Sequence, residues 1–443
     1  MGHKCNCREM TIKSIFLQWS VAIKEHERLL DDLAKWTEVN TIELSDIYMD
    51  WDPEVSGHDA FLSVPNAEGI HDLRPPLLGE RELNVLLRYM ELVRSKGLDV
   101  ACNFTPLFVC LPDEPSMACV DVRGKPVIFS HGFPVGCPNN PTVKRYSEVM
   151  LRQVVLTWSH ANRICMNHME YPLWANGGIQ ELLVCFCQWC QAKAEDQGID
   201  FKHVRHEVET LYDALLQDRK HSSGPEAIFS AGCVMGYLLK HPLVASWIKF
   251  RLDSMTEYVT DLVGIGRQAA NEHNPDLKFG LEFILPAMAT VFGTDFVSLS
   301  PVFDWITPKF PDYLPGSIIP KVAKEIASAS GGSWDTEQTM RPIRQLFDLG
   351  PGPDTYVPVS NPIPDIDYLN AYDLSIPARQ MKHLESIVGS VPIYPYLWLT
   401  NHDLDHMRGK VNAVRELGFQ GQFVWCWEND LSPDAIKAAK GVF

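Results

Sequence analysis

The sequence has no apolar run long enough to cross a bilayer, and residues 1–10 are too polar to form the apolar centre of a signal peptide. Basic residues are in short supply, since the formal net charge is −17 and the pI is about 5.3. Nucleic acids and anionic membranes are bound by clustered Lys and Arg, so we expect neither as a partner. The chain is predicted to be cytoplasmic and to bind a small molecule, and its sequence leaves homo-oligomerisation open.

Several catalytic motifs are also missing. The chain has no G-x-S-x-G elbow, no H-E-x-x-H pair and no Walker loop, and no organic cofactor is expected. Its 12 cysteines are mostly dispersed, which is unlike the dense disulfide framework of a small secreted domain. No linker or low-complexity segment divides residues 1–443, so a single domain is predicted.

Short apolar segments alternate with amphipathic segments along the whole chain. This alternation predicts an α/β protein, and the count of eight strands without a Gly-rich phosphate loop favours a (β/α)8 barrel over a doubly wound sheet. The predicted strands are Ile12–Ser20, Thr41–Met49, Leu98–Phe108, Ile164–Tyr171, Leu277–Leu285, Phe296–Ile306, Val391–Leu399 and Gln422–Trp427. The predicted helices are Ala22–Trp36, Glu80–Lys96, Pro141–Asn162, His241–His273, Ser317–Ser328, Pro377–Val388, Leu404–Leu417 and Ser432–Lys440. Long insertions are expected at about 50–79, 112–140, 174–240 and 331–373.

One group of cysteines stands apart from the others. Cys185, Cys187 and Cys190 form a C-x-C-x2-C run, and Cys137 in the Cys-Pro-Asn-Asn-Pro segment is a candidate fourth ligand. Four thiolates at such spacing suit a closed tetrahedral zinc site, which is typical of structural zinc. A disulfide pair, or buried thiols without metal, is the alternative.

These two cysteine segments resemble those of the β-galactosidases of glycoside hydrolase family forty-two. That family carries a Cys-Pro-Asn-Ser-Pro-like segment after barrel strand three and a C-x-C-x2-C run after strand four, and the four cysteines bind structural zinc. The resemblance covers roughly residues 132–194 together with the strand–helix rhythm. It implies a barrel glycosidase whose zinc lies near the active face. Residues 280–310 also resemble uncharacterised bacterial barrel proteins described as glycosidase-like.

Glycoside hydrolysis needs two carboxyl groups, and in a barrel both lie at the carboxyl ends of strands. Glu170 precedes Tyr171 at the end of predicted strand four, where the family places its acid/base residue in an Asn-Glu-Tyr context. Pairing with Arg163 or Lys193 on the rim is the alternative role of Glu170. Glu282 lies in an apolar strand and Asp304 precedes Trp305, and each is a candidate partner because an unpaired buried acid is costly. A buried ion pair, for example with Lys309, is the alternative role of these two acids.

The chain departs from the family at strand seven, where the family has its nucleophilic Glu. Residues 391–403 contain no Glu, so the resemblance leaves the second carboxylate to Glu282 or Asp304. Further polar and aromatic residues at strand ends are predicted to form a substrate-binding rim. These residues are Asp50, Trp51, Asn103, His168, Trp174, Lys309, Trp398, His402, Trp427 and Glu428.

Three functions agree with this pattern. The first is a glycoside hydrolase that acts on a small carbohydrate through Glu170 and a second carboxylate. The second is a sugar-acid lyase or isomerase in which rim His and Lys residues move protons. The third is a carbohydrate-binding barrel without catalysis, which the missing strand-seven Glu would explain.

Overall fold

The structure is a computed structural model, and a large part of the chain can be described from it. The described residues are 13–45, 80–107, 115–128, 134–158, 160–172, 178–217, 224–283, 286–309, 314–349, 375–398, 404–419, 422–425, 432–438 and 440. Strands and helices alternate along these residues, which confirms the predicted α/β class. No helix within these ranges is both long and apolar enough to cross a membrane.

Eight strands in the described part of the chain form one sheet in the order β6-β5-β4-β3-β2-β1-β8-β7, and every neighbouring pair is parallel. The strands are β1 (Lys13–Gln18), β2 (Thr41–Ser45), β3 (Asp99–Phe104), β4 (Arg163–Met166), β5 (Lys278–Phe283), β6 (Trp305–Pro308), β7 (Tyr396–Trp398) and β8 (Gln422–Trp425). Parallel bridges also join Ile306 to Ile393 and Lys309 to Tyr396. The segment that contains β7 therefore also contacts β6 and the residue after it.

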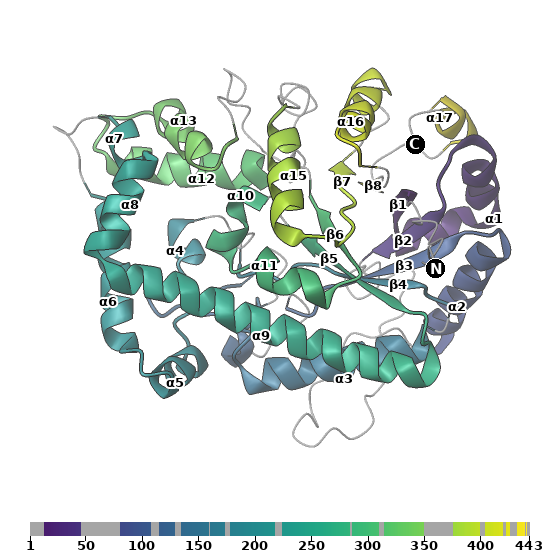
Figure 1. The fold of residues 1–443 in the computed structure, drawn as a ribbon, viewed down its shortest axis with the longest axis horizontal. Coiled ribbons are helices and arrows are strands. Elements are labelled where there is room, and N and C mark those ends of the chain that lie inside the picture. The colour runs from purple at the N-terminus through teal and green to yellow at the C-terminus, as the bar shows by residue number, and fades with distance from the viewer. Residues whose placement is uncertain are drawn as a thin grey trace, which may run out of the picture.

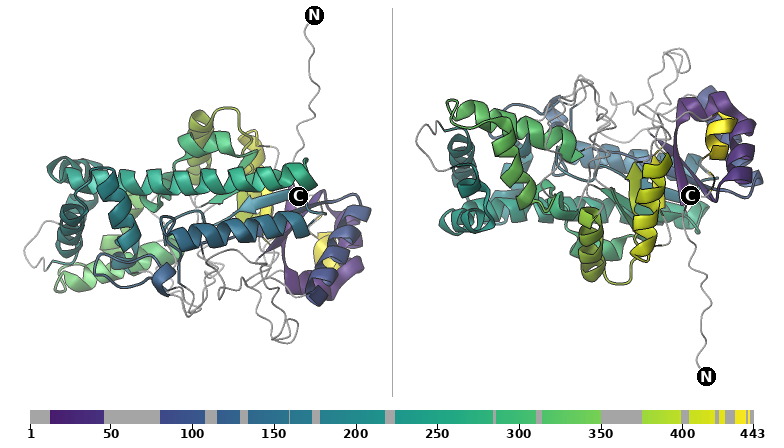
Figure 2. Two further views of the ribbon diagram at one scale, coloured as in Figure 1. Left: turned by 90° about the horizontal axis from the view of Figure 1, so that it is seen from below. Right: turned by 90° about the horizontal axis from the view of Figure 1, so that it is seen from above.

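Helices surround this sheet (Figure 1). They are α1 (Trp19–Trp36), α2 (Glu80–Ser95), α3 (Pro141–Thr157), α4 (Ile179–Leu182), α5 (Gln188–Asp196), α6 (Phe201–Leu215), α7 (Glu226–Phe229), α8 (Ala231–Lys240), α9 (Pro242–His273), α10 (Pro286–Ala289), α11 (Phe296–Leu299), α12 (Leu314–Ala329), α13 (Thr336–Leu346), α15 (Ser375–Val388), α16 (Leu404–Glu416) and α17 (Pro433–Ala438), with 3-10 turns η1 (Pro115–Met117), η2 (Thr290–Phe292) and η3 (Ser300–Val302). Helix α3 begins where Asn140 accepts a hydrogen bond from the Thr142 N–H and Pro141 takes the first helical position. It runs beside α9 (Figure 2, left).

The predicted strand Phe296–Ile306 is wrong over its first part. The carboxylate of Asp295 accepts hydrogen bonds from the N–H groups of Val297 and Ser298, which starts α11 instead of a strand. The turn η3 follows, and β6 begins only at Trp305. Phe296 and Leu299 are buried in the helical form, whereas Val297 is 60% exposed. The hydrophobicity of this segment alone did not distinguish helix from strand.

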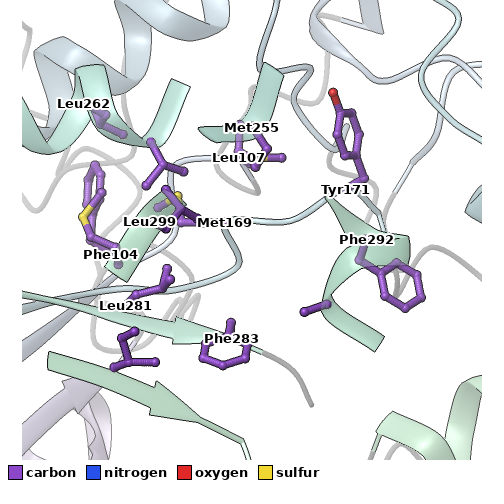
Figure 3. Packing of buried hydrophobic residues seen from close by; sticks show 14 of the residues in the cluster. Phe104, Leu107, Met169, Tyr171, Met255, Leu262, Leu281, Phe283, Phe292 and Leu299 are labelled. Carbon is purple, nitrogen blue, oxygen red and sulfur yellow. The ribbon is translucent and has the colours of Figure 1, made fainter. Parts of the chain in front are cut away.

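The two faces of the sheet have different surroundings. Outward side chains such as Ile42, Leu44 and Leu281 pack with the helices in one large apolar cluster, of which Figure 3 shows a part. The inward side chains form a small second cluster of Cys165, Trp305 and Tyr396. These three residues come from β4, β6 and β7, so the sheet curves strongly enough to bring distant strands into contact.

Gly280 on β5 tests this inner packing because it lies in register with Trp305 on β6. A Cβ atom at residue 280 would overlap the Trp305 indole ring. We expect Gly280→Ala to lower the free energy of unfolding by about 1–3 kcal/mol in denaturant titrations, because the buried ring has little room to move. The matched control is Gly264→Ala on α9, where nothing lies within 4 Å of the added Cβ and a gain of up to about 1 kcal/mol is expected. Equal effects at the two sites would contradict this view of the inner core.

Candidate active site

Polar side chains form a layer on the inner face of the sheet. Glu43 of β2, Asn103 of β3 and Glu282 of β5 are all buried, with 0%, 1% and 1% of each residue exposed. The sequence neighbours of each residue pack into the large apolar cluster against the helices. Because side chains alternate along a strand, the polar side chain itself points to the inner face. Buried polar groups must be paired, and here they pair with one another.

Asn103 connects the two carboxyl groups. Its Nδ2 donates to Glu43 Oε1 at 3.2 Å and to Glu282 Oε2 at 2.9 Å, and its Oδ1 accepts from Asn167 Nδ2 at 3.0 Å. The side-chain amide thus has partners on both its nitrogen and its oxygen. This arrangement fixes the orientation of both glutamates.

Lys309 follows β6 and supplies a positive charge to the layer. Its Nζ lies 3.0 Å from Glu282 Oε1 and donates to Asn167 Oδ1 at 2.8 Å. The lysine side chain is 18% exposed and that of Glu282 is 2% exposed, so the ion pair is largely shielded from water. Such a pair is costly to break from one side because the remaining charge stays buried.

Glu170 and His168 lie just beyond the end of β4 and form the second half of the site. Glu170 is 1% exposed, and its Oε1 lies 2.8 Å from His168 Nδ1. Within the described residues its Oε2 has no hydrogen-bond partner, although it is buried. Burial and the positive charge of Lys309 lower the pKa of His168, so its imidazole is neutral at neutral pH.

The backbone at His168 is held in an uncommon conformation. Its φ is 55°, in the left-handed region that residues other than glycine seldom adopt. The His168 N–H donates to Asn167 Oδ1 at 2.8 Å, the same oxygen that accepts from Lys309. Asn167 therefore joins the Glu282–Lys309 pair to the Glu170–His168 pair in one network. Backbone strain of this kind is often found where a site requires a fixed geometry.

The structure brings together five of the residues predicted from sequence: Glu170, Glu282, Asn103, His168 and Lys309. The alternative pairing of Glu170 with Arg163 or Lys193 is absent among the described contacts. Arg163 pairs with Asp99 at 3.0 Å, and Lys193 pairs with Glu257 at 2.9 Å.

Asp304 was expected at the carboxyl end of a strand, and this expectation is wrong. Asp304 precedes β6, and its Oδ2 accepts from the backbone N–H of Phe279 at 2.8 Å and from Arg267 Nη2 at 3.0 Å. Phe279 is near the start of β5, so Asp304 lies at the amino ends of the strands, opposite the Glu282 network. Strand β6 lies between Asp304 and Lys309, so the two residues are at opposite ends of the strand although they are close in sequence.

Other predicted rim residues cannot be placed. The backbone of Trp398 lies in β7, but its side chain is outside the description. The remaining predicted residues all lie outside the described ranges: Asp50, Trp51, Trp174, His402, Trp427 and Glu428. Their substrate-binding roles stay predictions.

Sequence analysis missed Glu43 and Asn167. Glu43 lies between Ile42 and Leu44 in an apolar strand, which is the same signal that marked Glu282. Asn167 directly follows β4 and precedes His168. In this chain, an acid inside an apolar strand therefore indicates a residue of the polar layer on the inner face of the sheet.

Lys309 should be essential for the stability of the layer. We expect Lys309→Met to lower the free energy of unfolding at neutral pH by about 3–5 kcal/mol, because the Glu282 carboxylate loses its counter-charge while remaining buried. Adding Glu282→Gln to this variant should recover much of the loss. The control Lys249→Met removes a lysine that is 73% exposed and should change the free energy by less than about 0.5 kcal/mol. A double variant as unstable as Lys309→Met would show that the ion pair is not the cause.

The predicted cysteine cluster is assembled in the structure. Ligand atoms of Cys137, Cys185, Cys187 and Cys190 all lie within 4.8 Å of one another, and all four residues are buried. The Sγ atom of Cys137 is 3.5 Å from that of Cys190 and 3.5 Å from that of Cys187. Backbone and amide groups also donate to the sulfurs: Val120 N–H to Cys185 at 3.2 Å, and Asn139 Nδ2 to Cys190 at 3.3 Å.

A buried cation, Arg251 on α9, lies near this cluster. Its guanidinium stacks on the rings of Tyr171 and Trp247 at 4.5 and 4.6 Å and donates from Nη1 to the Val291 carbonyl at 2.8 Å. Burial lowers the pKa of Arg251 to about 10, so the group remains charged at neutral pH. Tyr171 directly follows Glu170, so its contact with Arg251 connects the neighbourhood of the cluster to the carboxylate site.

No known family model matches the chain, and no curated protein matches its sequence. Solved structures do share its fold. The glycoside hydrolase domain of PgaB (BpsB) from Bordetella bronchiseptica superposes with a TM-score of 0.52 at 13% identity, over 98% of each chain. A polyextremophilic beta-galactosidase from the Antarctic haloarchaeon Halorubrum lacusprofundi gives 0.51 at 12% identity, over 97% of this chain and 57% of that one. The protein therefore has a glycosidase-like α/β fold, while such low identity leaves its activity to be argued from the site.

Proposed function

We propose that the protein is a glycoside hydrolase built on a complete (β/α)8 barrel, with Glu170 as its general acid. The observation that carries this proposal is Glu170 itself, a buried carboxyl group at the end of β4 with one oxygen against a neutral imidazole and the other without a described partner. Catalytic groups of such barrels lie at the carboxyl ends of strands. The bridges between β6 and the segment leading into β7 support full closure of the barrel.

Glu282 is the proposed second carboxylate. Glu282 forms an ion pair with Lys309, while the neutral His168 beside Glu170 can accept a hydrogen bond from a carboxylic acid. A glycosidase needs this division between a proton donor and a carboxylate. The proposed substrate is a small carbohydrate or glycoside, and the resemblance to family forty-two and the structural neighbours support this substrate class.

The cysteine cluster is proposed to hold structural zinc. Tetrahedral zinc with Zn–S bonds of about 2.3 Å requires sulfur atoms about 3.8 Å apart, and the described 3.5 Å separations fit that requirement. Four thiolates around Zn²⁺ carry a net negative charge, and Arg251 would partly balance it. Zinc would stiffen the loops beside Glu170 and take no part in the reaction.

An assay with a panel of chromogenic glycosides and short oligosaccharides tests the activity. We expect the wild-type protein to release sugar from at least one of them, and Glu170→Gln and Glu282→Gln to release far less. Folding of each variant is checked by its thermal transition. A wild-type protein that carries its metal but cleaves no glycoside would contradict the proposal.

A lyase or isomerase acting on a sugar acid is the second candidate. It is favoured by one observation: Lys309 and His168, both capable of proton transfer, lie in the same network as the carboxylates. This enzyme would convert sugar acids without releasing a second sugar, so product analysis by NMR separates the two activities. In a lyase or isomerase, Lys309→Met would abolish conversion of the sugar acid. In a hydrolase, Glu170→Gln would be the variant that abolishes release of sugar.

A further inference from the structure

Glu43 and Glu282 are held across a single amide group. Asn103 Nδ2 donates one hydrogen bond to each of them, at 3.2 and 2.9 Å. Oxygen atoms of the two glutamates and the sulfur of Cys165 lie within 4.8 Å of one another. Both glutamates are almost completely shielded from water, so two negative charges on them would repel each other strongly.

The charges around the pair do not balance if both glutamates are ionised. Among the described residues, Lys309, which follows β6, is the cation in contact with the pair, whereas Arg163 on β4 forms an ion pair with Asp99. Burial lowers the pKa of His168, which keeps it neutral, and burial raises the pKa of the Cys165 thiol, which therefore also carries no charge. The described inward side chains of the other neighbouring strands are uncharged: Ser14, Thr307, Tyr394 and Tyr396. Two carboxylates and one ammonium would leave a buried negative charge, and one proton removes it.

The two glutamates differ in what they contact. Glu282 Oε1 lies 3.0 Å from the ammonium of Lys309, whereas Glu43 has no described ion pair and its buried Oε2 has no described hydrogen-bond partner. Burial and the neighbouring Glu282 charge raise the pKa of Glu43 well above its usual range, although hydrogen bonds from Asn103 and Cys165 act in the opposite direction. The extra proton therefore belongs on Glu43.

We propose that the Glu43–Glu282 pair binds one proton, that this proton resides on Glu43, and that Glu43 is a positioning residue for Asn103 and Glu282. The protonated Glu43 keeps its hydrogen bond to Asn103, and Asn103 in turn holds the charged Glu282 against Lys309. Loss of the proton would place two negative charges across one amide and weaken that arrangement. The proposal concerns the protonation of the pair, so it stands or fails independently of the glycosidase activity.

Its effect on stability has a defined sign. The pKa of Glu43 in the folded chain is raised above the ordinary 4.5, so its stabilising contribution is complete below that pH and is lost as the pH rises through the folded pKa. Gln at residue 43 imitates the protonated acid at every pH. Glu43→Gln should therefore match the wild type near pH 4 and become progressively more stable than the wild type as the pH rises.

Infrared difference spectroscopy at neutral pH tests the assignment directly, because the C=O stretch of a carboxylic acid is well separated from the stretches of a carboxylate. The wild-type minus Glu43→Gln spectrum is expected to show one protonated-carboxyl band. Glu272→Gln, at an exposed glutamate of α9, should show only carboxylate bands. If Glu43→Gln also removes only carboxylate bands, Glu43 is ionised and the proposal is overturned.

Glu282→Asp supplies a second measurement should Glu43→Gln fail to fold, because it keeps the negative charge at residue 282 that favours a proton on Glu43. Its difference spectrum is expected to show changes in carboxylate bands alone, while the protonated-carboxyl band of Glu43 stays unchanged. A shifted or lost protonated-carboxyl band in Glu282→Asp would place the proton on Glu282 and overturn the proposal. A wild-type spectrum without any protonated band at neutral pH would do the same.

Discussion

Glu170→Gln is expected to lower kcat by roughly 10²–10⁴-fold, since general acid catalysis contributes about that much to bond cleavage. Gln keeps the shape of the side chain and can still hydrogen-bond His168, so folding and substrate binding should change little. The loss should depend on the leaving group. Dinitrophenolate leaves without being protonated, so kcat for a dinitrophenyl glycoside should fall little. An alkoxide needs a proton to leave, so kcat for an alkyl glycoside should show the full loss.

Steady-state kinetics with both leaving groups make this prediction decisive. Glu272→Gln removes a glutamate that is 69% exposed and should leave both rates unchanged. An equal loss for the two substrates would mean that Glu170 does not donate the proton. Unchanged kcat for the alkyl glycoside would remove Glu170 from the chemistry altogether.

If the proposed zinc is bound, Cys137→Ser is expected to abolish its binding and to lower the free energy of unfolding by about 4 kcal/mol or more, a loss typical of structural metal sites. The reason is that Cys137 lies in a different segment from the other three cysteines, and its Sγ is 3.5 Å from the Sγ atoms of Cys187 and Cys190. Three thiols cannot complete a tetrahedral shell from protein ligands alone. Zinc content by elemental analysis and the denaturation midpoint report the two effects separately.

Two other cysteines provide controls for the zinc prediction. Cys233 on α8 is exposed, and Cys233→Ser should change the free energy of unfolding by less than about 0.5 kcal/mol. Cys119 is buried, and its Sγ donates to the Gly136 carbonyl at 3.5 Å, so Cys119→Ala should keep one zinc per chain. Wild-type protein that contains no zinc while its four thiols are reduced would contradict the site.

Local patterns in the sequence predicted much of the framework. Alternation of apolar strands with amphipathic helices gave the α/β class and the position of each strand to within a few residues, except at Phe296, where a capped helix replaced a strand. The cysteine spacing predicted which four thiols would meet. Glu43 lies in the middle of a strand, whereas the acids predicted from the sequence lie at or near strand ends.

The sequence by itself determined the alternation of elements, the buried acids and the cysteine group, because these depend on short-range periodicity and spacing. Only the tertiary structure decided which acids meet. Asn103 and Glu282 are 179 positions apart and hydrogen-bonded, whereas Asp304 and Lys309 are close in sequence and lie at opposite ends of β6. Pairing across a parallel sheet depends on strand order and register, and neither is written in any local segment of the chain.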